Sequence, residues 1–138
     1  MRALETIVAT RVVATPAAID AFTTSASASA SAAAGAAVTV LRLAPDDALV
    51  LGAPETSVAI DDRHAIVVTE TGFSGVWLAA DAFDAIVGPF IEWSVPAARP
   101  ALAQGLIAGV PAKLWLLADR VLLLCPTAHA HDLHERLS

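Results

Sequence analysis

Three histidines near the carboxyl terminus, His129, His131 and His134, are the clearest cluster of residue types that could do chemistry. Imidazole nitrogens are common metal ligands, so the cluster raises a metal hypothesis. On a helix each residue advances by about 100°, which leaves His131 and His134 about 60° apart but turns His129 away from them. No cysteine or carboxylate at a useful spacing completes the set, and Asp132 projects elsewhere. The pattern favours a solvated helix face, and we predict no metal ligands.

The single cysteine, Cys125, ends an apolar run and immediately precedes a helix start. A helix dipole at that point could lower the pKa of the thiol and make it a nucleophile. However, Pro126 and the apolar residues Val121–Leu124 favour ordinary burial, and no histidine–acid pair is identifiable beside it. One cysteine also excludes an intrachain disulfide and suits a reducing cytoplasm.

Three carboxylates, Asp61, Asp62 and Glu70, flank a β-branched run and could supply a pair for acid–base chemistry. Turn residues and a solvated strand end explain them equally well. We therefore predict no catalytic residue in this chain, and the sequence leaves any cofactor-binding residues unknown.

The segment from His64 to Leu78 predicts a strand, a turn and a helix in succession. Ile66–Thr69 is β-branched, Thr71-Gly72 interrupts it, and the apolar spacing that follows predicts a helix from Ser74 to about Ile86. Glycines at a helix start could cradle a phosphate, but neither a Walker lysine nor three spaced glycines is present. We expect a positive φ at Gly72 and a helix cap at Ser74, so Gly72→Ala should cost roughly 1 kcal/mol or more.

The three tryptophans divide into two classes. Trp77 and Trp115 fit core positions. Trp93 lies in a proline-rich crossing beside Glu92 and is the better candidate for an interface anchor, since buried interface centres are enriched in tryptophan.

The amino-terminal half predicts a strand, a helix and a hairpin. Glu5–Ala14 is rich in Ile, Val and Thr, and Thr15-Pro16 supplies a helix cap with proline at the first helical position. Ser25–Ala34 alternates serine and alanine, so it could extend the helix or form a loose connection; we expect a short helix and a flexible tract over about residues 25–35. The residues after it predict a hairpin over Val38–Leu51 with a turn at Ala44-Pro45-Asp46-Asp47, and a short strand over Ser57–Ile60.

The carboxyl-terminal half predicts three strands and a closing helix after an irregular crossing over Phe90–Pro100. The expected strands are Leu102–Ile107, Ala112–Leu117 and Val121–Cys125, with a hinge at Gly109-Val110-Pro111 between the first two. Pro126-Thr127 is expected to open a helix that places Ala130, Leu133 and Leu137 on one face.

These elements predict one domain over residues 1–138 of the α+β class, with a largely antiparallel sheet and two to three helices. The hairpins Val40–Leu51 and Leu114–Leu124 share the order strand, Asp turn and apolar strand. Two βαββ-like halves are therefore an open alternative.

Composition limits the partners. The chain has 14 acidic and 8 basic residues, no cluster of Lys or Arg, and a mean hydropathy of +0.67. A nucleic acid or an anionic membrane surface is an unlikely partner, because both need a basic face. Neither a transmembrane span nor a secretory signal is recognisable, which favours a cytoplasmic location. High apolar content with few charges predicts a surface that another protein covers.

Three segments carry a resemblance to a known family. Val67-Val68-Thr69-Glu70-Thr71-Gly72-Phe73-Ser74-Gly75-Val76-Trp77-Leu78 resembles the signature segment of the aminomethyltransferase-like folate-binding superfamily. Ala44-Pro45-Asp46-Asp47-Ala48-Leu49-Val50-Leu51 and the closing hairpin and helix over Ala112–Leu137 are similar to those of the gamma subunits of heterotetrameric sarcosine oxidase.

The resemblance covers roughly Val38–Leu137 and implies a non-catalytic accessory subunit. In such a heteromer, larger flavoprotein subunits carry flavin, NAD and tetrahydrofolate and demethylate sarcosine oxidatively, while this chain holds no cofactor. The alternative is a stand-alone folate- or small-ligand-binding protein. An enzyme that uses Cys125 or the histidines is a third interpretation.

Overall fold

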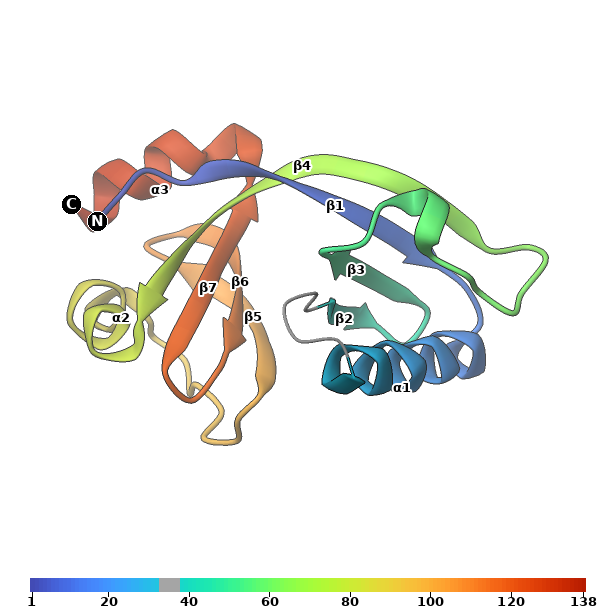
Figure 1. The fold of residues 1–138 in the computed structure, drawn as a ribbon. Helices are drawn as coiled ribbons and strands as arrows, with labels where there is room; N and C mark the ends of the chain where they lie inside the picture. The colour runs from blue at the N-terminus through green and yellow to red at the C-terminus, as the bar shows by residue number, and fades with distance from the viewer. Residues whose placement is uncertain (33–37) are drawn as a thin grey trace. The chain divides into compact units, whose positions relative to one another are not determined.

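The computed structural model describes residues 1–32 and 38–138 (Figure 1). By its internal contacts the chain divides into two compact units. The terminal unit comprises Met1–Ile7 and Thr71–Ser138, and the internal unit comprises Val8–Glu70. Two long strands, β1 (Glu5–Val13) and β4 (Ile66–Ala79), run through both units, because each strand crosses a point of division.

The internal unit packs one helix on a small antiparallel sheet. Strand β3 (Asp47–Leu51) pairs with β1 on one side and with β2 (Thr39–Ala44) on the other. Helix α1 (Pro16–Ala32) lies beside the β2–β3 hairpin (Figure 1). Its core consists of small and branched side chains from β1 and the residue after it, from α1 and from β3: Val12, Ala14, Ala18, Ile19, Ala48 and Val50.

The terminal unit has a larger core between one sheet face and two helices. Strand β7 (Arg120–Pro126) pairs antiparallel with β4 and with β6 (Val110–Leu116), and β6 pairs with β5 (Ala101–Ile107). Alternate residues of these strands, among them Val76, Leu114 and Leu123, pack with side chains of α2 (Ala80–Ile86) and α3 (Ala130–Leu137). Short 3₁₀ turns occupy Glu55–Ser57, Gly88–Phe90 and Thr127–His129.

The strand order is β2-β3-β1-β4-β7-β6-β5, and the described pairs are antiparallel. Together with the three α-helices found in the described part of the chain, this confirms the predicted α+β class and its largely antiparallel sheet. Elements β1-α1-β2-β3 are followed by β4-α2-β5-β6-β7, so the second series has one strand more than a βαββ pattern. The expectation of a single domain stays a prediction.

The predicted turn and helix start between Thr71 and Ser74 are wrong. Residues Phe73 to Ala79 continue β4 and pair with β7 from Pro126 to Arg120. Helix α2 begins only at Ala80 and ends at Ile86, close to the predicted end. Gly72 lies in β4 and, among the described glycines, positive φ occurs at Gly52 and Gly109. The expected left-handed turn at Gly72 is therefore also wrong.

Most other predicted elements are confirmed with small shifts at their ends. Thr15 Oγ1 accepts a hydrogen bond from Ala18 N at 3.3 Å, as a helix cap should. Helix α1 continues through Ala32, so the serine–alanine tract extends the helix that we expected to be short. Residues 33–35 of that tract lie outside the described residues. The short strand expected over Ser57–Ile60 is replaced by the 3₁₀ turn and irregular chain.

The hinge predicted at Gly109-Val110-Pro111 is a tight turn at Ala108-Gly109, and Val110 and Pro111 already belong to β6. Ala108 and Gly109 have φ of 49° and 79° and connect β5 to β6. Two consecutive positive φ values match the backbone of a two-residue hairpin, which explains the glycine there.

Candidate functional site

Ser74 is a strand residue whose hydroxyl donates a hydrogen bond inside the terminal unit. Its side chain is buried, with 1% relative exposure, and its Oγ donates to Thr127 Oγ1 at 3.0 Å. Thr127 Oγ1 in turn donates to the carbonyl oxygen of Thr71 at 3.4 Å. This chain of bonds ties β4 to the turn before α3. It does not present backbone N–H groups to a phosphate, because Ser74 is in a strand and not at a helix start.

Cys125 is buried in the core of the terminal unit, with 0% relative exposure. Burial disfavours the thiolate and raises the pKa of Cys125 to about 11. The local environment is therefore the opposite of one that activates a nucleophile.

We expect Cys125 of the folded chain to react with a disulfide reagent such as DTNB at pH 8 at least about 100-fold more slowly than in guanidinium chloride, because the folded thiol is both inaccessible and protonated. The rate of thionitrobenzoate release in the two solvents measures this ratio. Comparable rates would show that the thiol is exposed and ionised.

The three histidines do not converge on one point. His129 precedes α3, and His131 is exposed on that helix. His134 Nε2 lies 3.0 Å from the carbonyl oxygen of Met1, to which it donates a hydrogen bond. Among residues 1–32 and 38–138, no group of three or more His, Cys, Asp or Glu is arranged to hold a metal ion. His134 serves to fasten the amino terminus.

The candidate carboxylates also separate. Asp62 accepts hydrogen bonds from Thr15 N at 3.0 Å and His64 N at 2.9 Å, and these two bonds lower the pKa of the Asp62 carboxyl. Glu70 accepts from Arg11 Nη1 at 3.2 Å, and the same guanidinium forms a bidentate pair with Asp47 at 2.6 and 3.0 Å. Asp62 thus binds backbone N–H groups and Glu70 binds a guanidinium group, and these two carboxylates do not form an acid–base pair.

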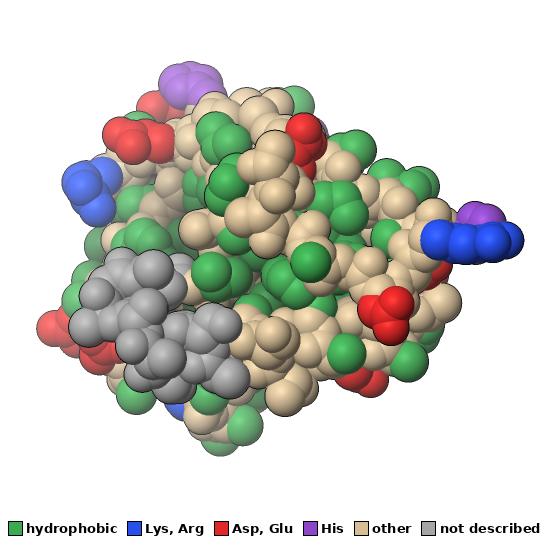
Figure 2. Space-filling view, turned by 45° about the vertical axis from the view of Figure 1, so that its right-hand side comes forward, with side chains coloured by type: hydrophobic (Ala, Val, Ile, Leu, Met, Phe, Trp, Pro, Cys, Tyr) green, Lys and Arg blue, Asp and Glu red, His purple; other side chains and the backbone are tan. Residues whose placement is uncertain are grey.

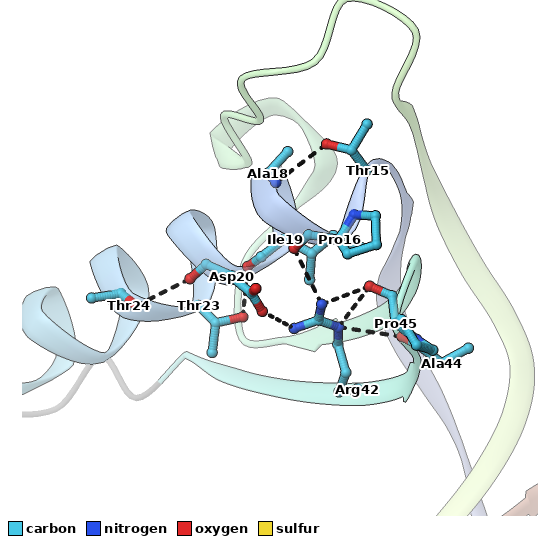
Figure 3. Close-up of polar contacts among 10 residues, drawn as sticks. All are labelled: Thr15, Pro16, Ala18, Ile19, Asp20, Thr23, Thr24, Arg42, Ala44 and Pro45. Atoms are coloured by element: carbon cyan, nitrogen blue, oxygen red, sulfur yellow. Dashed lines mark hydrogen bonds and ion pairs between the residues drawn. The ribbon is translucent and has the colours of Figure 1, made fainter.

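The polar cluster that sequence reasoning missed is centred on Arg42 (Figure 3). Its guanidinium forms an ion pair with Asp20 at 2.7 Å and donates to the carbonyl oxygens of Pro16, Ala44 and Pro45 at 2.6–3.2 Å. Pro16 and Asp20 are one helical turn apart, so both face the same side. Arg42 therefore holds the first turns of α1 against the turn between β2 and β3.

Replacing Arg42 with methionine should destabilise the chain by about 1–2 kcal/mol, because several charge-assisted bonds are lost at a half-buried side chain. Arg42→Lys should recover only the ion pair with Asp20, since an ammonium cannot span the carbonyl groups. Urea unfolding measures both variants. Within residues 1–32 and 38–138, Arg99 donates to carbonyl groups of its own loop, so Arg99→Met is the control and should change stability by less than about 0.5 kcal/mol.

The three tryptophans have different surroundings. Trp77 is 36% exposed, and the guanidinium of Arg120 lies 4.4 Å from its ring, so the predicted core position is wrong. Trp115 is half-buried. Trp93 packs within its own unit: its indole covers Gly105, and Nε1 donates to the carbonyl oxygen of Leu106 at 2.8 Å.

Among the depressions lined by described residues are two that could each hold a small molecule. One, of about 370 Å³, lies in the terminal unit and has the side chains of Phe73, Leu106 and Lys113 among its walls. The other, of about 390 Å³, lies in the internal unit and is lined mainly by small residues of α1 and the loops after β3, with Asp61 as its charged group. Figure 2 shows hydrophobic side chains reaching the visible surface between scattered charged groups.

None of the helices in the described residues is long and apolar enough to cross a membrane.

Comparison with known proteins finds a likeness of fold without a match of sequence. No protein-family model matches the chain, and neither does any curated protein. A chain of the heterotetrameric sarcosine oxidase from Corynebacterium sp. U-96, solved in complex with pyrrole 2-carboxylate, is similar, with a TM-score of 0.70 and 15% sequence identity. The match covers 97% of this chain and 79% of that chain. At this identity the likeness shows a shared fold.

Proposed function

We propose that this chain is a non-catalytic accessory subunit of a heteromeric, flavin-dependent oxidase that demethylates sarcosine or a similar amine. The observation that carries the proposal is the fold likeness over nearly the whole chain to a component of a heterotetrameric sarcosine oxidase. Short segments of the sequence, such as Ala44–Leu51, are similar to the gamma subunits of the same class of enzyme. Fold and sequence segments thus support one kind of complex.

The non-catalytic role is supported by what the polar side chains do. Ser74, Asp62 and His134 each bind a group of the protein itself, and Cys125 is buried with a raised thiol pKa. These contacts stabilise strands, loops and termini. We place flavin, NAD and tetrahydrofolate in larger partner subunits and assign this chain to their assembly, in the cytoplasm.

Isolation of the complex tests the partnership. An affinity tag on this chain, expressed from its native genetic locus, should recover larger subunits with flavin absorbance, and added sarcosine should bleach that absorbance. Deletion of the chain should reduce the sarcosine-dependent hydrogen peroxide production of the cell extract, and re-expression should restore it. Recovery of the chain as a lone monomer, with unchanged sarcosine oxidation in the deletion strain, would contradict the proposal. Tetrahydrofolate binding by such a monomer would support the stand-alone alternative.

The absence of a catalytic role has a separate test. Cys125→Ala and the double variant His129→Ala/His131→Ala should each support the same sarcosine-dependent turnover per assembled complex as the natural chain. Because Cys125 is buried, its variant can lower the yield of complex, so turnover must be divided by flavin content. A loss of turnover in correctly assembled complex would assign chemistry to this chain.

A further inference from the structure

A hollow of about 310 Å³ lies in the terminal unit, between α2 and the irregular chain that connects α2 to β5. The charged side chains of its lining are Asp84, from α2, and Arg99, from the connecting chain. The other side chains that line it are apolar, among them Ile91, Trp93 and Val95. A volume near the lower end of the range for ligand sites indicates a small molecule.

Arg99 is oriented by its own loop and keeps part of its guanidinium for a ligand. Arg99 Nη1 donates to the carbonyl oxygens of Pro96 at 2.5 Å and Ala98 at 2.9 Å. A guanidinium has five N–H donors, and in the part of the chain that the structure describes the Nε and Nη2 edge of Arg99 makes no hydrogen bond or ion pair. Two donors on one edge of a planar fork match the two oxygens of a carboxylate.

Asp84 carries a negative charge that the protein does not compensate. It lies in the last turn of α2, where the helix dipole places partial negative charge and disfavours a carboxylate. The ion pairs among residues 1–32 and 38–138 join Arg11, Arg42 and Arg136 to other carboxylates. An ammonium group that entered the hollow would supply the missing positive charge.

The two charges identify the class of ligand. Asp84 and Arg99 line one hollow without forming an ion pair with each other, as far as the described residues show. A ligand with a single charge would match one of them and leave the other unpaired. At neutral pH an amino acid carries both an ammonium and a carboxylate group, so it matches both. The apolar walls then favour an amino acid whose side chain is apolar.

We propose that this hollow binds a small apolar amino acid in its zwitterionic form. The ligand ammonium donates to the Asp84 carboxylate, the ligand carboxylate accepts from Nε and Nη2 of Arg99, and the ligand side chain lies against Ile91, Trp93 and Val95. The site goes beyond the proposed accessory role and does not depend on membership of an oxidase complex.

Titration of the isotope-labelled full-length chain with L-leucine, followed by NMR, tests the site. We expect saturable shifts of the amide signals of Asp84, Val95 and Arg99 and of the indole N–H signal of Trp93. Isocaproate lacks the ammonium group of leucine, and isoamylamine lacks its carboxylate group. Each should bind at least about tenfold more weakly than leucine, because one protein charge stays unpaired. No saturable shifts, equal affinities for the three ligands, or shifts that map elsewhere would overturn the proposal.

Matched variants assign each charge to one end of the ligand. Asp84→Asn should remove the preference for leucine over isocaproate, and Arg99→Met should remove the preference for leucine over isoamylamine. Asp81→Asn changes another exposed carboxylate of α2 that does not line the hollow, so both preferences should persist. All three positions are exposed, so the variants should stay folded. Preferences that survive in the Asp84 and Arg99 variants, or that are lost equally in Asp81→Asn, would refute the assignment.

Discussion

Replacing Gly75 with alanine is expected to destabilise the chain by about 1–3 kcal/mol, the usual cost of overpacking a filled interior. A Cβ atom at this position would lie 2.7 Å from Ile7 Cδ1, 2.7 Å from Leu124 Cδ2 and 2.9 Å from the carbonyl oxygen of Leu123. The two side chains could turn aside, but the carbonyl group belongs to the backbone of β7, which is paired on both sides. Chemical unfolding followed by circular dichroism measures the change.

Gly72→Ala is the matched control on the same strand. Gly72 is exposed and lacks a positive φ, so alanine should be accommodated there, with a change in unfolding free energy of less than about 0.5 kcal/mol. This outcome replaces the penalty expected from a left-handed turn at Gly72. An equal cost at both positions would show that β4 resists any added side chain and that the contacts of Gly75 are not the cause.

The course of β4 explains why the sequence predicted a helix there. Val76, Trp77, Ala80 and Phe83 recur at helical spacing, but the strand from Phe73 to Ala79 has large apolar residues on both of its faces. A strand that is apolar on both faces lacks the alternation that identifies a strand, and helical spacing can then arise by chance. Pairing with β7 is a long-range interaction. It stabilises a strand here although the local spacing of apolar residues favours a helix.

Short sequence patterns predicted correctly those features that depend on residues close together in the chain. The turn predicted within Ala44–Asp47, which lies at Pro45-Asp46, the Thr15 cap and the apolar face of the last helix, with Leu133 and Leu137 buried, are all confirmed. The strands β5, β6 and β7 are confirmed as well, since turns at Ala108-Gly109 and Asp119 delimit them. Each of these features joins residues that are near neighbours in the chain.

The polar contacts could not be predicted from the sequence, because their partners are far apart in the chain. Arg42 binds Asp20 and Pro16 across more than 20 positions, and Arg11 reaches Glu70 across 59. No spacing rule identifies such partners from one sequence. The same holds for the hollow beside Lys113, because strand register alone brings Phe73 and Leu106 to its walls.

Trp93 shows how a glycine can decide the position of an aromatic side chain. The interface anchor that the sequence indicated stays a prediction; within the chain, the indole lies so close to β5 that a Cβ atom at Gly105 would come within 2.5–2.9 Å of three ring atoms. The hydrogen bond from Nε1 to Leu106 O fixes the same orientation. Glycine at position 105 is therefore required by the close approach of the ring, since its φ is not positive.

Gly105→Ala should accordingly expel the indole, remove the bond to Leu106 and destabilise the chain by about 1–3 kcal/mol. In a Trp93→Ala background the obstacle is gone, so the same substitution should be neutral within about 0.5 kcal/mol, and the double-mutant cycle should show strong coupling. The indole N–H signal of Trp93 should also exchange faster with solvent in Gly105→Ala, because its acceptor is lost. If Gly105→Ala lowered the free energy of unfolding equally in the Trp93→Ala background, the need for glycine would come from the backbone of β5 and not from the packed ring.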